Sequence, residues 1–234
     1  TAVKSAIALI SWSGSMFEYL MPNLVMRNPR GSLLDETNRS VVRRQRDYGA
    51  RRKLPWGVSE SAYNARDIEF TYQYSSFGVP GLGLKRGLGD DAVVAPYATS
   101  LGAMIAPHAA VQNFTRLAAA GGSGRYGWYE ALDYTPVRLP ENEKVAVVRC
   151  YMAHHQGMAL IALANALRQG AMRSRFHAEP ISQATGLLLP YRPPRAAGPG
   201  ADRRVGAKGA VRGSWAGGSR PGRPGRGRAG SGRP

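Results

Sequence analysis

Three features that would define a protein class are scarce or absent in this sequence. Cys150 is the single cysteine among 234 residues, so the chain can form no internal disulfide and no cysteine-based zinc site, which fits a reducing compartment. No run of 18 or more apolar residues occurs, so no segment is expected to span a bilayer. The first residues lack both an initiator Met and the pattern of a signal peptide, which suggests a piece of a longer protein.

Acidic residues are also scarce, with 15 Asp and Glu against 32 Lys and Arg, and the formal net charge is +17. Such a balance is found in proteins that bind nucleic acid or anionic membranes. Much of the excess, however, lies in residues 196–234, and part of the rest lies in an arginine-rich run over 43–53 that reads as a solvated helix face. The basic tail has too few aromatic residues to indicate RNA binding. We therefore expect no nucleic-acid partner.

The composition divides the chain into two parts. Residues 196–234 contain 12 Gly, 8 Arg and 4 Pro, and such a segment buries too little apolar surface to offset its chain entropy. We predict a disordered Gly/Arg/Pro-rich tail over 196–234 and one foldable domain over 1–195.

Hydrophobic periodicity in the first part predicts an all-α fold of helix pairs joined by long functional loops. Gly and Pro residues mark 54–90 as loop, in which only 65–74 has a helical pattern, and a second loop carries Glu130. Asp35 is expected to cap the basic helix. No β-alternation is evident. The predicted helices cover residues 14–27 with a break at Pro22, 35–52, 92–105, 107–120, 144–169, 170–177 and 180–189.

Three glutamates share an unusual setting among aromatic and small residues, with almost no other charge nearby. Glu18, Glu60 and Glu130 each lie within a few residues of Trp, Tyr or Phe and of Ser, Gly or Ala. A glycosidic bond is cleaved by two carboxyl groups, and partial burial raises the pKa of the one that donates the proton. The pattern therefore indicates sugar chemistry. The alternative is that each glutamate caps a helix or pairs with a buried arginine.

Glu60 and Glu130 are the candidate catalytic pair, because both are predicted on loops that leave helix ends. Glu18 either serves the site or forms a structural pair with Arg27 or Arg30. The candidate substrate-binding residues are polar or aromatic side chains near these glutamates or on the predicted helix over 144–169: Glu18, Tyr19, Trp56, Asn64, Asp67, Tyr126, Trp128, Asp133, His154, His155 and Gln156.

Two other motifs are weaker candidates for a site. His154 and His155 are adjacent and point to different helix faces, so they do not form the i, i+4 pair of a zinc helix, and we expect no metal. The glycines of 78–89 suggest a phosphate-binding loop by composition alone. Because the Gly-Lys-Ser/Thr ending is missing, we expect them to allow tight backbone turns instead, and we expect no cofactor.

Five motifs resemble, in order, the glycoamylase-like domain of bacterial cyclic β-1,2-glucan synthases, and the likeness runs from about residue 5 to 190. The motifs are Trp12–Pro22, Pro55–Asn64, Tyr72–Arg86, Tyr126–Thr135 and Tyr151–Met158. The resemblance implies an incomplete (α/α)6 toroid, lying between glycosyltransferase and phosphorylase-like modules of a parent protein at the cytoplasmic face of the inner membrane.

The resemblance also implies a reaction. The corresponding domain is thought to cut one link of a linear β-1,2-glucan and to join the cut end to the chain's own other terminus. Such a transfer favours a retaining mechanism, with Glu60 and Glu130 as acid/base and nucleophile in an order that the sequence leaves open. Glu18, Asp67 and Asp133 are held in reserve. An endo-hydrolase of β-1,2-glucan and a non-catalytic glucan-binding remnant are the alternatives.

Two departures from the family accompany the likeness. Helices and sugar-binding residues that the family has before residue 1 are absent from the sequence. After about Arg192 the family continues with ordinary helical sequence, whereas this chain becomes rich in Gly, Arg and Pro. A shift of reading frame is our hypothesis for that change, and translation of the other frames of the coding DNA tests it.

Overall fold

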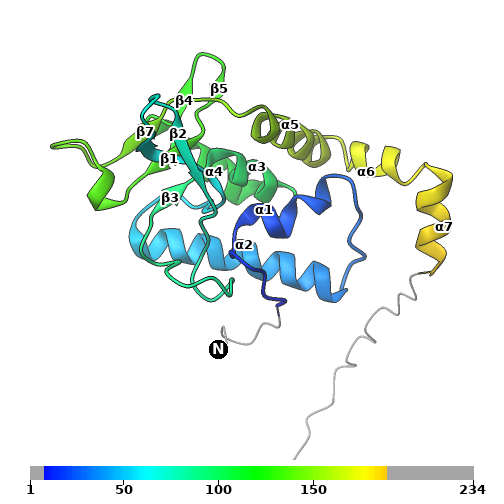
Figure 1. The fold of residues 1–234 in the computed structure, drawn as a ribbon. Helices are drawn as coiled ribbons and strands as arrows, with labels where there is room; N and C mark the ends of the chain where they lie inside the picture. Colours follow the sequence, from blue (N-terminus) through cyan, green and yellow to red (C-terminus); the bar gives the residue numbers. More distant parts are fainter. Residues whose placement is uncertain (1–7, 189–234) are drawn as a thin grey trace, which may run out of the picture. The chain divides into compact units, whose positions relative to one another are not determined.

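A computed structural model describes residues 8–188 of the chain, so the predicted tail over 196–234 lies outside the described residues. Short strands lie beside the helices, mostly at one end of them (Figure 1). The α-helices are α1 Met16–Leu20, α2 Leu33–Arg52, α3 Pro96–Ala103, α4 Pro107–Ala119, α5 Ala153–Leu167, α6 Ala171–Phe176 and α7 Pro180–Leu188, with 3-10 helices η1 Pro22–Leu24 and η2 Pro136–Arg138. The strands are β1 Ser61–Arg66, β2 Tyr72–Ser75, β3 Val93–Val94, β4 Ser123–Gly124, β5 Gly127–Trp128, β6 Ala131–Asp133 and β7 Ala146–Val148.

Helix α2 follows the rules of helix ends. The hydroxyl of Ser32 accepts from the amide of Asp35, so the cap lies three residues before the predicted Asp35. Asp35 and Glu36 occupy the first turn and two arginines the last turn, where each charge complements the helix dipole. Lys53 ends the helix in the left-handed conformation. The buried face of α2, with Val41 and Val42, packs against α1 and is part of the hydrophobic core.

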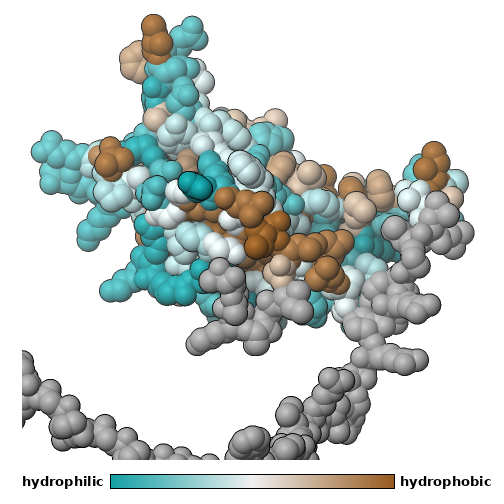
Figure 2. Space-filling model, turned by 60° about the horizontal axis from the view of Figure 1, so that its bottom comes forward, coloured by the Kyte–Doolittle hydropathy of each residue, from teal (hydrophilic) through white to brown (hydrophobic). Residues whose placement is uncertain are grey.

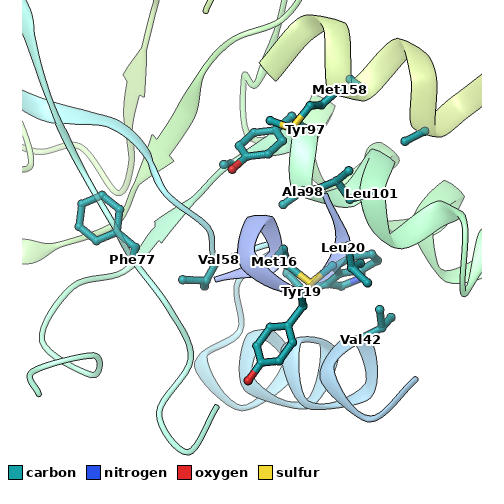
Figure 3. Packing of buried hydrophobic residues seen from close by; sticks show 14 of the residues in the cluster. Met16, Tyr19, Leu20, Val42, Val58, Phe77, Tyr97, Ala98, Leu101 and Met158 are labelled. Atoms are coloured by element: carbon teal, nitrogen blue, oxygen red, sulfur yellow. The ribbon is translucent and has the colours of Figure 1, made fainter. Parts of the chain in front are cut away.

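Helix α3 is the centre of the core, and it packs against α1, α4 and α5. All eight of its residues are buried, and five of them are the small residues Ala, Ser, Thr and Gly, which allow close packing. A side chain at Gly102 would meet the ring of Trp56 at 2.7 Å, so glycine is needed for this close approach. Met16, Leu20 and Leu101 are fully buried where α1 meets α3, as Figure 3 shows. This core fixes the elements that carry the candidate site.

The strands correct the prediction of an all-α fold. They form three small antiparallel sheets: a β1–β2 hairpin, a β4–β5 pair, and a three-stranded sheet in the order β3-β6-β7. In the last sheet Ala131 lies opposite Val148, and Val93 lies opposite Asp133. Helices contain more residues than strands in the described structure, so the prediction is correct for most of its helices and wrong in expecting no strands.

Three predicted helices differ from the structure for identifiable reasons. The segment 65–74 turns back as a hairpin, because Asp67 accepts from two amides of the turn and Phe70 adopts a φ of 60°. Residues 146–148 form β7 instead of the start of a long helix, since this β-branched run pairs with β6, and α5 begins only at Ala153. The helix expected over 92–105 begins as β3. The other predicted helices are confirmed within a few residues.

The glycine-rich loop lies directly against the segment before α1. A Cβ on Gly78 would lie 1.7 Å from the carbonyl oxygen of Ser13, so only glycine fits there. Backbone hydrogen bonds join the two segments, among them Val79 to Gly14 at 3.2 Å and Lys85 to Trp12 at 2.8 Å. Gly78 and Gly83 therefore serve close backbone approach, which the sequence did not predict, whereas the positive φ of Gly81 and Gly87 fits the expected turns.

An apolar pocket of about 290 Å³ lies beside α1 and the start of α2. Leu9, Ile10, Met26 and Leu34 line it, and each is close to half exposed. Hydrophobic side chains also gather on the face of the molecule shown in Figure 2. Among residues 8–188, no helix is both long and apolar enough to cross a membrane.

Candidate active site

Glu130 lies immediately before β6 and is almost completely buried, with 2% of its surface exposed. Its Oε1 accepts from the amide of Ala62 at 3.2 Å and lies 2.7 Å from Nδ1 of His155. Its Oε2 is also buried and makes no hydrogen bond to any residue in the described part of the chain. A buried carboxylate oxygen without a partner is costly, and such atoms are found where function requires them.

Glu60 lies immediately before β1 and is only partly buried. The hydroxyl of Tyr74 donates to its Oε1 over 2.8 Å. The hydroxyl of Tyr97 donates to its backbone carbonyl over 2.9 Å and lies 2.8 Å from the hydroxyl of Ser59. The antiparallel register of β1 and β2 places Tyr74 opposite Ala62, two residues after Glu60, which explains why the two side chains meet.

His155 connects these two glutamates. It lies in the first turn of α5, is fully buried, and stacks on the ring of Tyr97 with centroids 3.8 Å apart. Its Nδ1 faces Glu130, and its Nε2 lies 3.3 Å from the hydroxyl of Tyr74. A continuous series of contacts therefore runs from Glu60 through Tyr74 and His155 to Glu130.

Burial and negative charge shape the ionisation of the groups around this cluster. Burial, reinforced by the hydrogen bond to Glu60, raises the pKa of Tyr74 well above its ordinary value, and burial raises the pKa of Tyr97 similarly. Both phenols are therefore neutral donors at physiological pH. Burial and the Glu130 charge raise the pKa of the Cys150 thiol to about 11, so it is not a reactive thiolate. Burial and the neighbouring His155 lower the pKa of His154.

Asp133 has a different environment, although it lies only three residues after Glu130. Its two oxygens accept from the amides of Asn64 and Thr135 and from Arg138, whose Nε lies 2.7 Å from Oδ2. Arg138 also forms a salt bridge with Asp91 at 2.6 Å. Burial lowers the pKa of Arg138, but its contacts with the two aspartates outweigh this effect and raise it. Both oxygens of Asp133 are buried and, in contrast to Oε2 of Glu130, already accept hydrogen bonds, so neither is available to a sugar. Its position is that of a structural anchor.

The other predicted residues near α1 are also held by structural contacts. Glu18 accepts from the amides of Ser13 and Gly14 at about 3 Å, which closes the loop before α1. The hydroxyl of Tyr19 donates to backbone carbonyls, including that of Leu82 at 2.5 Å. Trp56 is 4% exposed and belongs to the core. The structure places these three residues around α1 and in the core, apart from the Glu60–Glu130 cluster.

The remaining predicted residues are exposed or partly buried. His154 is exposed beside His155, and Tyr126 is 72% exposed. The side-chain amide of Gln156 donates to the carbonyl of Trp128, whose ring stacks on Phe114. Asp67 is exposed and caps its own turn, whereas the side chain of Asn64 donates to the carbonyl of Arg138. His154, Tyr126 and Asp67 therefore offer polar or aromatic surface to a ligand.

Tyr74 and Tyr97 belong to the cluster, but the sequence does not predict them as site residues. The sequence places Tyr74 in a possible helix over 65–74 and Tyr97 in the predicted helix over 92–105, and neither pattern points to the glutamates. A signal existed for Tyr74, because the alternation of Tyr72 and Tyr74 is typical of a strand. Within residues 8–188, no group of three or more His, Cys, Asp or Glu residues lies close enough to hold a metal ion.

Comparisons with known proteins support the family of this chain. A sequence model of the family described as "Putative glucoamylase" matches residues 1–180. The chain is 55% identical over 188 residues to the cyclic β-(1,2)-glucan synthase NdvB of Rhizobium meliloti (strain 1021), covering 80% of this chain and 7% of that protein. It therefore spans only a small part of that relative.

Solved structures share the fold at lower identity. A structure from Bacteroides caccae with the same glucoamylase description has a TM-score of 0.53 at 21% identity, and an endo-β-1,2-glucanase from Chitinophaga pinensis has a TM-score of 0.53 at 20% identity. Each likeness covers 74% of this chain and 40% of the other chain. The chain thus has part of the glucoamylase-like fold, and by its match over residues 1–180 it belongs to the glucoamylase-like family.

Proposed function

We propose that this chain is the cyclisation part of a cyclic β-1,2-glucan synthase. It cuts one link of a linear β-1,2-glucan and joins the cut end to the other terminus of the same chain. The observation that carries this proposal is the meeting of Glu60 and Glu130, which lie 70 positions apart in sequence, in one hydrogen-bonded cluster. The 55% identity to the Rhizobium meliloti synthase supports β-1,2-glucan as the substrate.

The different burial of the two glutamates supports different roles. Glu60 is partly exposed beside Tyr74 and the exposed His154, so we assign it as the acid/base that protonates the glycosidic oxygen. The unpartnered Oε2 of Glu130 is assigned as the nucleophile that attacks the anomeric carbon. Because Oε2 is buried, the side chains that cover it must shift when the sugar binds.

The reaction then follows a retaining sequence. Glu60 gives its proton to the leaving oxygen while Glu130 forms an ester with the anomeric carbon. The hydroxyl at the chain's own other end next attacks this carbon, its proton goes to Glu60, and the Glu130 carboxylate leaves. Attack by water instead would give a linear product. The exclusion of water from the ester therefore separates a ring-forming enzyme from a hydrolase.

The surroundings of the domain are also part of the proposal. We place the described helices within an (α/α)6 toroid, which the likeness to glucoamylase-like structures supports. The chain corresponds to 7% of a much longer synthase, which supports further modules in the parent protein. From the family resemblance, these are a glycosyltransferase and a phosphorylase-like module, located at the cytoplasmic face of the inner membrane.

The test is incubation of linear β-1,2-glucan with the full-length parent protein that contains this domain. We expect the wild type to form rings, which mass spectrometry recognises because a ring is lighter than the linear chain of equal length by one water. Glu60→Gln and Glu130→Gln should each lower ring formation by about 10²–10⁴-fold. Glu69→Gln is the matched control, since Glu69 is exposed in the turn between β1 and β2. Linear products alone would favour the endo-hydrolase, and full activity in either site variant would remove that residue from the pair.

A further inference from the structure

The series of contacts that links Glu60 to Glu130 through Tyr74 and His155 limits where the protons can lie. The hydroxyl of Tyr74 has one proton, yet it lies within hydrogen-bonding distance of both Oε1 of Glu60 and Nε2 of His155. It can donate to only one of them at a time. The other contact is a hydrogen bond only if the partner supplies a proton to the phenol oxygen.

Two arrangements satisfy every contact. In the first, Tyr74 donates to an ionised Glu60, and a protonated His155 donates to Tyr74 through Nε2 and to Glu130 through Nδ1. In the second, a protonated Glu60 donates to Tyr74, and Tyr74 donates to Nε2 of a neutral His155 whose Nδ1 still donates to Glu130. Both contain the same number of protons and the same net charge, so they interconvert by shifting two protons along existing hydrogen bonds.

We propose that Tyr74 and His155 form a relay that keeps one shared proton between Glu60 and the ionised Glu130. The shared proton resides on Glu60 in one arrangement and on His155 in the other. The hydroxyl of Tyr74 reverses its direction of donation between the two. Tyr74 and His155 are thus positioning residues of the proposed reaction, and this role rests on the proposed function of the two glutamates.

The burial of the relay favours this arrangement. His155 is fully buried and Glu130 is 2% exposed, so bulk water cannot exchange protons directly with either group. Tyr97 stacks on His155 and holds the ring in the orientation that serves both contacts. Tyr74, 41% exposed, closes the side toward Glu60. His154, Tyr97 and Cys150 are nearby ionisable groups whose pKa values are affected by the charges of this cluster.

The relay predicts how the proposed reaction uses its proton. When Glu60 has protonated the leaving oxygen and is ionised, the hydroxyl of Tyr74 turns to donate to it. When Glu60 recovers a proton from the incoming hydroxyl, the donation of Tyr74 turns back toward His155. Each carboxyl state therefore retains a hydrogen-bonding partner without any rearrangement of heavy atoms.

The experiment is a double-mutant cycle read by nuclear magnetic resonance on the full-length protein with ¹⁵N-labelled histidine. Glu60→Gln is expected to change the Nε2 chemical shift of His155, because the proton can no longer be shared. In a Tyr74→Phe background the same Glu60→Gln change should have no effect on that signal. Tyr72→Phe is the matched control, since its hydroxyl on the same strand bonds Arg66 instead, and it should preserve the effect.

The possible outcomes each decide the relay. An equal effect of Glu60→Gln in the wild-type and the Tyr74→Phe backgrounds would show influence through space and overturn the proposal, as would no effect in either background. In glucan assays, Tyr74→Phe should alter the pH dependence of kcat/KM, whereas Tyr72→Phe should not. A wild type without glucan activity would refute the proposed function, and the resonance measurement would still decide the relay.

Discussion

Glu130 and Asp133 are two buried carboxylates only three residues apart, and their surroundings are opposite. Both oxygens of Asp133 have partners, and Arg138 neutralises its charge. Glu130 has a histidine in place of an arginine, and its Oε2 has no partner in the described chain. A fully paired buried charge stabilises the fold. An incompletely paired one destabilises it, and such groups are frequent at functional sites. The difference separates scaffold from candidate site within one short segment.

Removal of the arginine should give the largest effect. Arg138→Ala leaves Asp133 buried and unpaired, and we expect the free energy of unfolding to fall by about 3–5 kcal/mol. Chemical denaturation measures this loss. Arg39→Ala is the control, since half of the Arg39 side chain is exposed and the buried Asp35 that it pairs with keeps a hydrogen bond from the amide of Gly31, so the loss should be smaller, about 1 kcal/mol. Similar losses in both variants would remove Asp133 from the scaffold.

Glu130→Gln should show the reverse pattern. The amide keeps the shape of the side chain and can still accept from Ala62 and His155, so the free energy of unfolding should change by less than about 1.5 kcal/mol. Ring formation from linear glucan should nevertheless fall by about 10²–10⁴-fold, because the charged oxygen is lost. Asp133→Asn is the comparison and should destabilise the protein more than Glu130→Gln does. The reverse order of the two stability losses would contradict the distinction.

Tyr97 tests whether the cluster depends on a ring or on a hydroxyl. Tyr97→Phe keeps the stacking on His155 but removes the bonds to Ser59 and to the carbonyl of Glu60. We expect a loss of about 1–2 kcal/mol in the free energy of unfolding, since the carbonyl of Glu60 loses this donor and the hydroxyl of Ser59 keeps only the amide of Phe17. Tyr97→Leu also removes the stacking, so it should cost more and disturb the His155 resonance. If the two variants behave alike, the ring contributes nothing beyond its volume.

The sequence indicates three of the residues that meet in the cluster, but not the strands that begin directly after two of them. Glu60 and Glu130 are candidates because of their aromatic, uncharged surroundings, and His155 because it lies on an apolar predicted helix. The structure brings the three together, and their catalytic roles stay predictions. Tyr74 and Tyr97 are not predicted because 65–74 has the pattern of a helix instead of a hairpin, and because Tyr97 reaches His155 only through the packing of α3 against α5. No local pattern shows that β2 returns beside β1, or that Val147 pairs with Leu132 instead of continuing a helix.

Substitution of Glu18, the third glutamate, should have the smallest effect on the free energy of unfolding. Burial favours a raised pKa, but hydrogen bonds from Ser11, Ser13 and Gly14 outweigh it, so the pKa of Glu18 is lowered from 4.5. A carboxylate with a lowered pKa stabilises the fold above its unfolded pKa, and this contribution is lost as the pH falls through the folded value. The stability of Glu18→Gln should therefore depend less on pH below about 4.5 than that of the wild type. Denaturation at several acidic pH values measures this difference. Unchanged ring formation by the same variant at neutral pH would place Glu18 in the scaffold with Asp133, and a large loss would return it to the site.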